Sequence, residues 1–395
     1  MQRLILFLLV QLKDCQLTDG QRRREATSYE VQHDHHGTHY LLSSERGPYD
    51  RLPELQDPCN GWLKRGICKC NETNIRCVNA QYTLSSLNLT AIGQNFSQLE
   101  SLTLRGNNFM QLPAYLLGED VVHSKLKRLD LGANYIINLN ASTLRNFPNL
   151  EELVLDQNQI GLRHGEDSEF LRWTPNLKFL SLNWAFNFIN STAHWMAFTH
   201  MLERSKPTQL TGLVMARNRL KQVHADVPCL LPRLDYLDLR NNQLEDLYLN
   251  PDCLCYAGKR GFPRCQRKRL RIDLASNPRM RRVGRRTRET IEQLAPRSVV
   301  LNRNLYCDCQ SVHFLRWLRD TDRLENADSL RCAKSSPDVF WGWSVHDVPL
   351  QNLTCELDLE TYVKGGVATL PRRVTVSAVL AISTLSPMFA ARLWL

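Results

Sequence analysis

The chain has 395 residues, of which 43% are hydrophobic and 23% charged, and this length is ample for one large domain with a sizeable core. Its formal net charge of +10 is concentrated, because ten Arg and one Lys lie between Arg264 and Arg288. Its 13 cysteines fall in clusters, which points away from the cytosol, where thiols stay reduced and rarely cluster for structural reasons.

The first residues have the composition of an export signal. Met1, Gln2 and Arg3 are followed by seven apolar residues, Leu4 to Val10, as in the hydrophobic region of a signal peptide. We therefore expect a signal peptide at residues 1–19, with a cleavage point that the sequence leaves open. Residues 20–56 show neither a helical nor a strand period, and we expect them to form a flexible leader.

A recurring phrase, L-x-x-L-x-L-x-x-N, organises residues 81–300. It begins at Leu99, Leu126, Leu150, Leu210 and Leu234. Regular spacings of 27, 24 and 24 residues fall within the period of about 20–29 residues that leucine-rich repeats have. One repeat cannot bury its own apolar face, so stacked neighbours must share a core. The pattern predicts an α/β solenoid of about seven to eight leucine-rich repeats. Its curved parallel β-sheet should line the concave face, and irregular or short helical segments should form the convex face.

Two insertions interrupt the repeats. In the fourth repeat, which begins at Leu177, Ala185 stands where the phrase has Asn, and the next start follows after 33 residues, at Leu210. We expect a locally irregular coil there, and an inserted helix near residues 192–204 within an insertion at 184–208. A second insertion spans residues 248–268. Four cysteines in or near it should form two disulfides, in an order that the spacing leaves open. They are Cys229, Cys253, Cys255 and Cys265.

Four cysteines lie at each end of the repeats. The first cluster, in residues 57–80, is Cys59, Cys68, Cys70 and Cys77, and the second, in residues 301–357, is Cys307, Cys309, Cys332 and Cys355. A terminal strand would otherwise expose unpaired backbone groups and its half of the core. We therefore expect a cysteine-rich cap at each end, with a short amphipathic helix around Phe314 to Leu318 covering the last coil.

The last segment is hydrophobic. Residues 374–395 are apolar apart from Thr, Ser and Arg392, and they follow a stalk at residues 358–373. Small residues, a spacer and a hydrophobic tail are typical of a GPI-anchor signal, with Gly365 or Gly366 as the attachment site. A single C-terminal transmembrane helix is the alternative. Both predict a membrane-tethered protein on the extracellular face of the plasma membrane.

Six N-x-S/T sequences indicate a glycoprotein, because such asparagines accept glycans on exposed loops of exported proteins. They are Asn71, Asn88, Asn95, Asn140, Asn190 and Asn352.

The two cysteine clusters, with the repeats between them, resemble the flanking domains of extracellular leucine-rich-repeat proteins. This resemblance implies first-to-third and second-to-fourth pairing, that is, the disulfides Cys59–Cys70, Cys68–Cys77, Cys307–Cys332 and Cys309–Cys355. The insertion after Leu182 and the segment from Cys307 to Ala333 are also similar to the trophoblast glycoprotein family. That resemblance implies a cell-surface modulator, an inhibitor, of Wnt signalling that acts through a co-receptor. A more distant resemblance, to Nogo-receptor-like and connectin-like proteins, implies homophilic or heterophilic cell adhesion as the alternative.

A solenoid of this kind normally binds through the exposed side chains of its concave sheet. Aromatic and Arg residues dominate interface energetics, so they are the first candidates for contact with a protein ligand or co-receptor. On this face we single out Phe179, Trp184, Tyr236 and Arg240.

The basic run predicts a second partner, because clustered guanidinium groups suit sulfate or phosphate. Outside the cell the abundant polyanion is heparan sulfate, and we expect no nucleic acid partner. The candidate residues are Arg264, Arg267, Lys268, Arg269, Arg271, Arg281, Arg282, Arg285, Arg286 and Arg288.

No catalytic motif is present. The sequence lacks H-E-x-x-H, G-x-S-x-G and G-x-x-x-x-G-K-[ST], so metalloprotease, serine-hydrolase and P-loop chemistry lack their minimum parts. We expect a binding protein rather than an enzyme, with no cofactor and no metal site.

Overall fold

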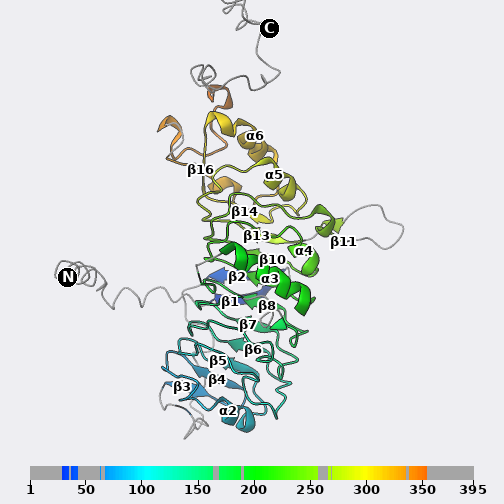
Figure 1. The fold of residues 1–395 in the computed structure, drawn as a ribbon. Helices are drawn as coiled ribbons and strands as arrows, with labels where there is room; N and C mark the ends of the chain where they lie inside the picture. The colour runs from blue at the N-terminus through cyan, green and yellow to red at the C-terminus, as the bar shows by residue number, and fades with distance from the viewer. Residues whose placement is uncertain are drawn as a thin grey trace, which may run out of the picture.

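A computed structural model describes residues 29–34, 37–42, 63, 67–162, 169–187, 191–256, 266–267, 269–334 and 338–353. The chain winds into a stack of coils, each of which contributes one short strand to a common sheet (Figure 1). This is the predicted leucine-rich-repeat solenoid.

The main sheet has ten strands, which follow one another in chain order. β3 and β4 pair antiparallel, and every later pair is parallel. The strands are β3 (Cys68–Cys70), β4 (Asn74–Cys77), β5 (Ser101–Thr103), β6 (Arg128–Asp130), β7 (Glu152–Val154), β8 (Phe179–Ser181), β9 (Gly212–Val214), β10 (Tyr236–Asp238), β13 (Arg271–Asp273) and β14 (Val299–Val300).

Smaller sheets lie outside this stack. β1 (Tyr29–Asp34) and β2 (Gly37–Leu42) form an antiparallel hairpin in the leader, and β11 (Cys255–Tyr256) and β12 (Gln266–Arg267) form another in the second insertion. β15 (Asn304–Leu305) and β16 (Arg331–Cys332) pair in the C-terminal cap.

Short helices occur in the coils and in the C-terminal cap. The α-helices are α2 (Leu89–Asn95), α3 (Ser191–Ser205), α4 (Val227–Leu230), α5 (Arg285–Glu292) and α6 (Val312–Asp320). The 3-10 helices are η4 (Pro251–Cys253), η5 (Cys309–Ser311), η6 (Ala327–Ser329), η7 (Asp338–Phe340) and η8 (Leu350–Asn352).

Leucines at the strand centres form the core. Leu102, Leu129 and Leu153 pair side by side from coil to coil and are fully buried. Since the strands have only two to four residues, each can hold its place only by bonding to its neighbouring strands. The shared core and the shared backbone ladder therefore stabilise the coils together.

The asparagine that ends each phrase connects successive coils. Asn134 donates its Nδ2 to Leu104 O of the preceding coil at 2.9 Å, and its Oδ1 accepts the N–H of Asn107 at 3.1 Å. Asn158, Asn242 and Asn277 donate in the same way to the preceding coil. The asparagine side chains therefore form hydrogen bonds with backbone groups that the turns would leave buried and unpaired.

The residue before each of these asparagines has a left-handed backbone. Its φ lies between 52° and 73° in seven successive coils. In the first six, its N–H donates to a carbonyl of the next coil, as Gln157 does to Asn183 O at 2.8 Å. This turn is a rare conformation for residues other than Gly or Asn, so the coil-to-coil bond must compensate for its strain. The residues are Gly106, Ala133, Gln157, Trp184, Arg217, Asn241 and Ser276.

The expected irregularity at Ala185 is wrong for the strand and turn of that coil. β8 pairs in register with both β7 and β9, and Trp184 keeps the left-handed turn. The missing asparagine would have connected the third and fourth coils. Asp156 connects them instead: its Oδ1 accepts the Ser181 hydroxyl at 2.5 Å and the N–H of Asn183 at 2.9 Å.

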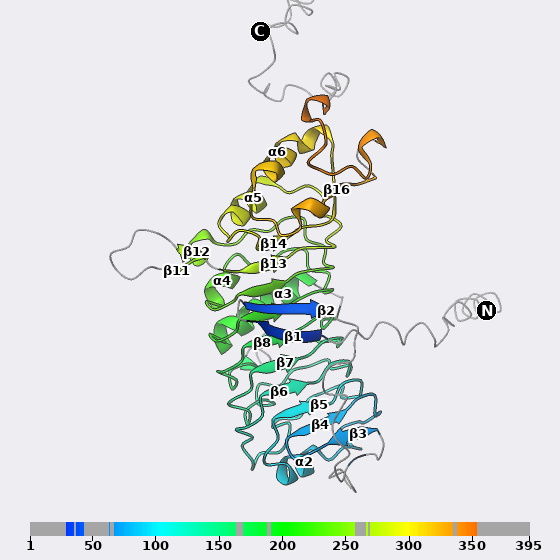
Figure 2. The ribbon, with the colours of Figure 1, turned by 180° about the vertical axis from the view of Figure 1, so that it is seen from behind.

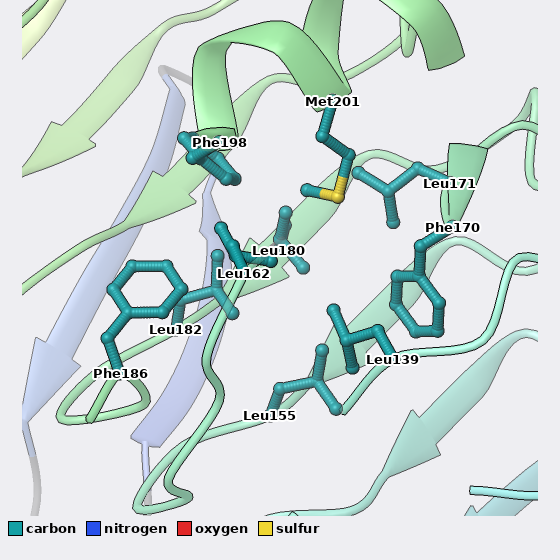
Figure 3. Close-up of a pocket in the computed structure, with 10 residues that line it drawn as sticks. All are labelled: Leu139, Leu155, Leu162, Phe170, Leu171, Leu180, Leu182, Phe186, Phe198 and Met201. Carbon is teal, nitrogen blue, oxygen red and sulfur yellow. The ribbon is translucent and has the colours of Figure 1, made fainter. Parts of the chain in front are cut away.

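The inserted helix predicted near residues 192–204 is present as α3, and its apolar side belongs to the core. Phe198 and Met201 are buried, whereas Met196 is 58% exposed. Beneath α3 lies a cavity of about 10 Å³, which is at the lower limit for one water molecule. Figure 3 shows its wholly apolar lining, so it offers no polar group to recognise a ligand. The lining residues are Leu139, Leu155, Leu162, Phe170, Leu171, Leu180, Leu182, Phe186, Phe198 and Met201.

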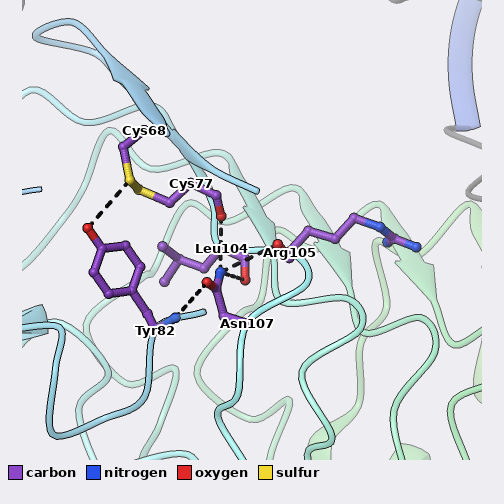
Figure 4. Close-up of a disulfide and its surroundings, with 6 residues drawn as sticks. All are labelled: Cys68, Cys77, Tyr82, Leu104, Arg105 and Asn107. Atoms are coloured by element: carbon purple, nitrogen blue, oxygen red, sulfur yellow. Dashed lines mark hydrogen bonds between the residues drawn. A yellow bond between two sulfur atoms is a disulfide. The ribbon is translucent and has the colours of Figure 1, made fainter. Parts of the chain in front are cut away.

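The N-terminal cap is joined to the first coil by a disulfide and an asparagine (Figure 4). Cys68 and Cys77 are bonded across the antiparallel pair β3–β4. Asn107 Nδ2 donates to Cys77 O at 3.0 Å, and Asn107 Oδ1 accepts the N–H of Tyr82 at 3.1 Å. Cys70 is also disulfide-bonded. Its implied partner, Cys59, lies outside the described residues.

The C-terminal cap contains the implied disulfide Cys307–Cys332, which joins the two ends of the β15–β16 pair. Cys309 is disulfide-bonded too, and its implied partner, Cys355, lies outside the described residues. The predicted amphipathic helix is α6, which buries Phe314, Leu315 and Leu318 against the last coil.

Several predictions concern residues outside the described part of the chain. They are the signal peptide, the GPI attachment site at Gly365 or Gly366, the stalk and the hydrophobic segment 374–395. Among the residues that the structure does describe, no helix has both the length and the apolar composition needed to cross a membrane.

Truncation of Phe198 tests the role of α3 in the core. The ring lies 5.6 Å from Trp195 and 6.4 Å from Phe186, centroid to centroid, so Phe198→Ala should lower the free energy of unfolding by about 3–5 kcal/mol. Met196→Ala, on the exposed side of the same helix, is the matched control and should change it by about 0.5 kcal/mol or less. Chemical denaturation measures both. Equal effects of the two substitutions would contradict the placement of α3.

Candidate binding surface on the concave sheet

Parallel pairing in register arranges the concave side chains in straight rows. One row runs from Phe179 in β8 through Gly212 in β9 to Tyr236 in β10 and Arg271 in β13. The next row holds Ser181, Val214, Asp238 and Asp273. Residues distant in sequence are thus neighbours about one strand spacing apart, roughly 4.8 Å.

Three of these residues, together with Ala216, form an apolar cluster separate from the main core. We call this cluster the aromatic patch: Phe179, Val214, Ala216 and Tyr236. Gly212 stands between the two rings and adds no side chain of its own. Burial raises the pKa of the Tyr236 hydroxyl, and the nearby Asp238 carboxylate adds to the effect, so the phenol stays neutral at physiological pH.

A charged group borders the patch. Arg240 lies between two carboxylates: its Nη2 is 2.6 Å from Asp238 Oδ2, and its Nε is 3.5 Å from Asp273 Oδ2. Burial lowers the pKa of Arg240, but the hydrogen bonds and charge of Asp238 outweigh this, so the net shift is upward and the guanidinium stays charged. Burial raises the pKa of Asp273 to about 6 despite the two nearby arginines.

Arg271 completes this border. Its Nε and Nη2 donate to the two carboxylate oxygens of Glu325 at 2.7 Å and 3.0 Å, and its guanidinium lies 5.5 Å from the centre of the Tyr236 ring. A bidentate pair holds the guanidinium in one orientation. The edge of the patch is therefore built from fixed charges rather than mobile side chains.

The N-terminal half of the concave face is different. Its strands carry charges paired between neighbours, such as Arg128 with Glu152 at 3.4 Å and Arg105 with Asp130 at 3.8 Å. Its outward positions in β5, Ser101 and Thr103, are half-exposed. No aromatic side chain stands in β5, β6 or β7, so the apolar contact surface belongs to β8–β10.

The four predicted contact residues divide three to one. Phe179 lies in β8 and Tyr236 in β10, on the outward side of the sheet, and Arg240 follows the end of β10. Trp184 is not in the rows: it occupies the left-handed turn after β8, where it is 46% exposed. Its N–H donates to Ala216 O at 2.9 Å, which places Trp184 at the rim of the aromatic patch.

Sequence reasoning missed the carboxylate of Asp273 and assigned Arg271 to the basic run instead of the sheet. The signal was available, because Ile272, Leu274 and Asn277 repeat the end of the phrase and align Arg271 with Tyr236.

The basic run does not form one cationic surface among its described members. Arg271 lies on the concave sheet, whereas Arg285, Arg286 and Arg288 belong to α5. Arg282 and Arg285 are each paired with a carboxylate, of Asp308 and Glu289. Arg281 and Arg282 both lie over the Tyr306 ring, at 5.8 and 5.5 Å.

The remaining members of the run add little to such a surface. Arg269 and Arg286 are exposed, and Arg288 donates to His313 O at 3.1 Å. Arg267 is described only in its backbone, and Arg264 and Lys268 lie outside the described residues. Heparan sulfate binding stays a prediction, with fewer free guanidinium groups than the sequence suggested.

The glycosylation candidates are compatible with modification. Asn88, Asn95, Asn140 and Asn352 are exposed, Asn71 is half-exposed, and Asn190 lies outside the described residues. None of the five described residues belongs to β8–β10.

Of the middle cysteines, Cys229 and Cys253 are bonded to each other, while Cys265 and the side chain of Cys255 lie outside the description. Asp226 approaches the same two sulfurs closely enough to suggest a metal site. Sulfurs joined in a disulfide are not thiolates, so the group lacks the ligands that a metal would need.

These observations define a class of protein: a leucine-rich-repeat solenoid with disulfide-bonded ends and a prominent apolar patch on its concave sheet. No family model matches the chain. Trophoblast glycoprotein of Macaca fascicularis is 24% identical over 297 residues, which are 71% of this chain and 64% of the relative. The chain thus spans less than two thirds of the length of that relative.

Solved structures agree on the fold. The crystal structure of human trophoblast glycoprotein, also named Wnt-activated inhibitory factor 1, matches with a TM-score of 0.53 and 20% identity. The match covers 75% of this chain and 100% of that chain. A complex of Drosophila Toll with Spatzle matches with a TM-score of 0.47 and 23% identity, over 70% of this chain and 34% of that chain. The sequence resemblance to trophoblast glycoprotein is therefore confirmed, and the solved structure of human trophoblast glycoprotein supports the solenoid.

The leader hairpin lies on the same face as the patch. Figure 2 shows β1 and β2 in front of the sheet at the level of β8 to β10, and Figure 1 shows them behind it, with α3 on the near side. β8, β9 and β10 are buried on both faces, unlike β5, whose outward residues are half-exposed. The burial of outward-facing side chains in β8–β10 fits a hairpin lying over them.

Deletion of residues 20–56 should therefore expose the patch. We expect hydroxyl-radical labelling of Phe179 and Tyr236, which are 8% and 4% exposed in the full chain, to rise several-fold. Tyr135, already 56% exposed, is the internal control and should keep its labelling. Unchanged labelling of Phe179 and Tyr236 would mean that the hairpin does not cover them.

The carboxylate of Asp156 makes the stability of the solenoid depend on pH. Burial raises its pKa to about 6, from an ordinary value of 3.8, despite hydrogen bonds from Ser181 and Asn183 that lower it. The folded state therefore binds more protons than the unfolded state between about pH 4 and 6, and stability should rise as the pH falls through that window.

Asp156→Asn keeps an acceptor for Ser181 and Asn183 and removes the charge. At pH 7.4 it should raise the free energy of unfolding by up to about 3 kcal/mol, since one pKa unit corresponds to about 1.4 kcal/mol. Denaturation at pH 7.4 and pH 5 measures this, and the gain should shrink at pH 5. Asp246→Asn, at an exposed position, controls for net charge. A loss of stability at pH 7.4 would show that the ionised carboxylate is needed to join the coils.

Proposed function

We propose that this chain is a cell-surface glycoprotein that binds a protein ligand or co-receptor through the concave face at β8–β10 and β13. In this proposal the chain inhibits Wnt signalling, as the name Wnt-activated inhibitory factor 1 indicates for its relative. The proposal includes tethering of the chain to the extracellular face of the plasma membrane by its C-terminal segment, through a GPI anchor or a transmembrane helix.

The observation that carries this proposal is the aromatic patch with its charged border. Phe179 and Tyr236 lie on the outward side of the sheet with Gly212 between them. They are 8% and 4% exposed beneath the leader hairpin, so the proposed ligand contacts them once the hairpin moves aside. Aromatic and Arg side chains at the centre of an interface supply most of its binding free energy. The rings and Arg240 are already fixed by their neighbours, so a ligand loses little side-chain entropy by contacting them.

The charges also indicate what kind of ligand fits. Beside the patch stand three carboxylates, of Asp238, Asp273 and Glu325, and two guanidinium groups, of Arg240 and Arg271. With one more negative than positive charge, this border favours a ligand surface with an apolar centre and Lys or Arg at its rim.

The proposal is tested by a Wnt reporter in cells that express the full chain. We expect the wild-type chain to reduce the reporter signal, and Phe179→Ser with Tyr236→Ser to lose most of that effect, because each lost aromatic contact costs about 2 kcal/mol or more at an interface centre. Tyr248→Ser, at a site that is 46% exposed and outside the strands, is the control. The variants are compared at equal amounts of protein on the cell surface.

The outcomes separate the two classes of function. A signalling effect that the double variant retains would exclude the aromatic patch as the site. Absence of any Wnt effect, together with aggregation of the expressing cells, would support the alternative, a homophilic or heterophilic adhesion molecule.

A further inference from the structure

The C-terminal cap presents apolar side chains that the solenoid core does not use. Val339, Trp341 and Trp343 are 65%, 60% and 44% exposed. We call these three residues the cap aromatic face. They belong to none of the coils and lie far along the chain from the aromatic patch, so the proposed ligand site does not explain them.

This face is held rigidly. Phe340, between Val339 and Trp341, is buried and packs edge-on against Trp343 with ring centres 5.4 Å apart. Gly342 N donates to Cys332 O at 3.1 Å, and Cys332 N donates to Trp343 O at 2.9 Å. The disulfide Cys307–Cys332 fixes this segment to the cap. Two exposed tryptophans on a braced turn are a built surface rather than a loose loop.

Cations accompany the aromatic rings. Lys334 Nζ lies 5.5 Å from the centre of the Trp341 ring. Arg331 donates to the carbonyls of Asp328 and Leu330, and its own N–H bonds to Arg303 O at 2.8 Å, so two further arginines adjoin the segment. Asp347, four residues after Trp343, is exposed. Tryptophan with adjacent Lys or Arg is the composition that membrane–water interfaces favour.

The position of the cap near the C-terminal apolar segment indicates that its partner is a membrane. The segments coloured orange, residues 338–353, lie at the end of the solenoid opposite α2 (Figure 1). From Leu353 there are 20 residues, 354–373, before the apolar segment 374–395 begins. Even when fully extended, 20 residues span at most about 70 Å. A membrane that holds the apolar segment is thus kept within reach of the cap, and the tether raises its effective concentration.

We propose that the cap aromatic face docks in the headgroup region of the membrane that anchors this chain, with Trp341 and Trp343 inserted among the lipid headgroups. The inference rests on the membrane tethering proposed above, in the form in which residues 374–395 stay in the chain as a transmembrane helix. It makes the cap a second point of attachment, which fixes the tilt of the solenoid and hence the direction in which the aromatic patch faces.

The test uses the full chain reconstituted in phosphatidylcholine vesicles, with and without lipids brominated near the headgroup, which quench nearby indoles. Trp394 lies within the apolar segment and reports insertion of that segment. To measure quenching of the cap tryptophans, we compare the Trp394→Phe variant with a variant that also carries Trp341→Phe and Trp343→Phe. We expect the quenched part of the remaining emission to fall by half or more when both cap tryptophans are replaced. Trp184→Phe, at an exposed site far from the cap, should leave the quenched part unchanged.

The readouts keep the two proposals apart. Quenching of Trp394 with no difference between the cap variant and its background would leave the anchor standing and overturn the docking. Vesicles that float without the protein would overturn the anchor and, with it, the docking. A melting temperature of the cap variant within a few degrees of wild type confirms that it is folded. If it is not, Trp341→Phe alone gives the same comparison with half the expected change.

Discussion

Every feature of this molecule depends on the hydrogen bonds between one coil and the next. A strand of three residues has too few bonds to persist alone, so each coil is stable only between neighbours that complete its ladder and cover its leucines. The asparagines, the left-handed turns and the two disulfide-bonded caps serve this one requirement. Asn107 shows the continuity: the same side chain that would bond two coils bonds the first coil to Cys77 of the cap.

The same constraint creates the proposed binding surface. Pairing in register leaves no freedom in which side chains become neighbours, so Phe179, Gly212 and Tyr236 must form a row once their strands pair. The patch is therefore as rigid as the core behind it. A protein that needs a stiff, preorganised contact surface can vary the outward residues of the strands while the inward leucines maintain the fold.

The sequence predicted what repeats and little of what does not. Leucine spacing located the strands, because burial of each Leu allows only one register. The prediction at Ala185 was wrong because a missing asparagine implies weak bonding between two coils. Only the fold shows that Asp156 bonds to Ser181 and Asn183 and so replaces the asparagine. The arginines misled for a similar reason. Residues that are close in sequence are separated when the chain coils, because Arg271 lies in the sheet and Arg286 lies in α5.

The charged border explains why a surface rich in ionised groups can be stable and still selective. Arg240 and Arg271 are held by Asp238, Asp273 and Glu325, so neither cation is buried without a partner. A ligand that brought a carboxylate would compete with groups already in place, and it would be repelled by the excess negative charge. A ligand that brought a cation would meet carboxylates whose positions are fixed. In the proposed function, the border discriminates mainly by repelling ligands of the wrong charge, while the rings of Phe179 and Tyr236 supply the affinity.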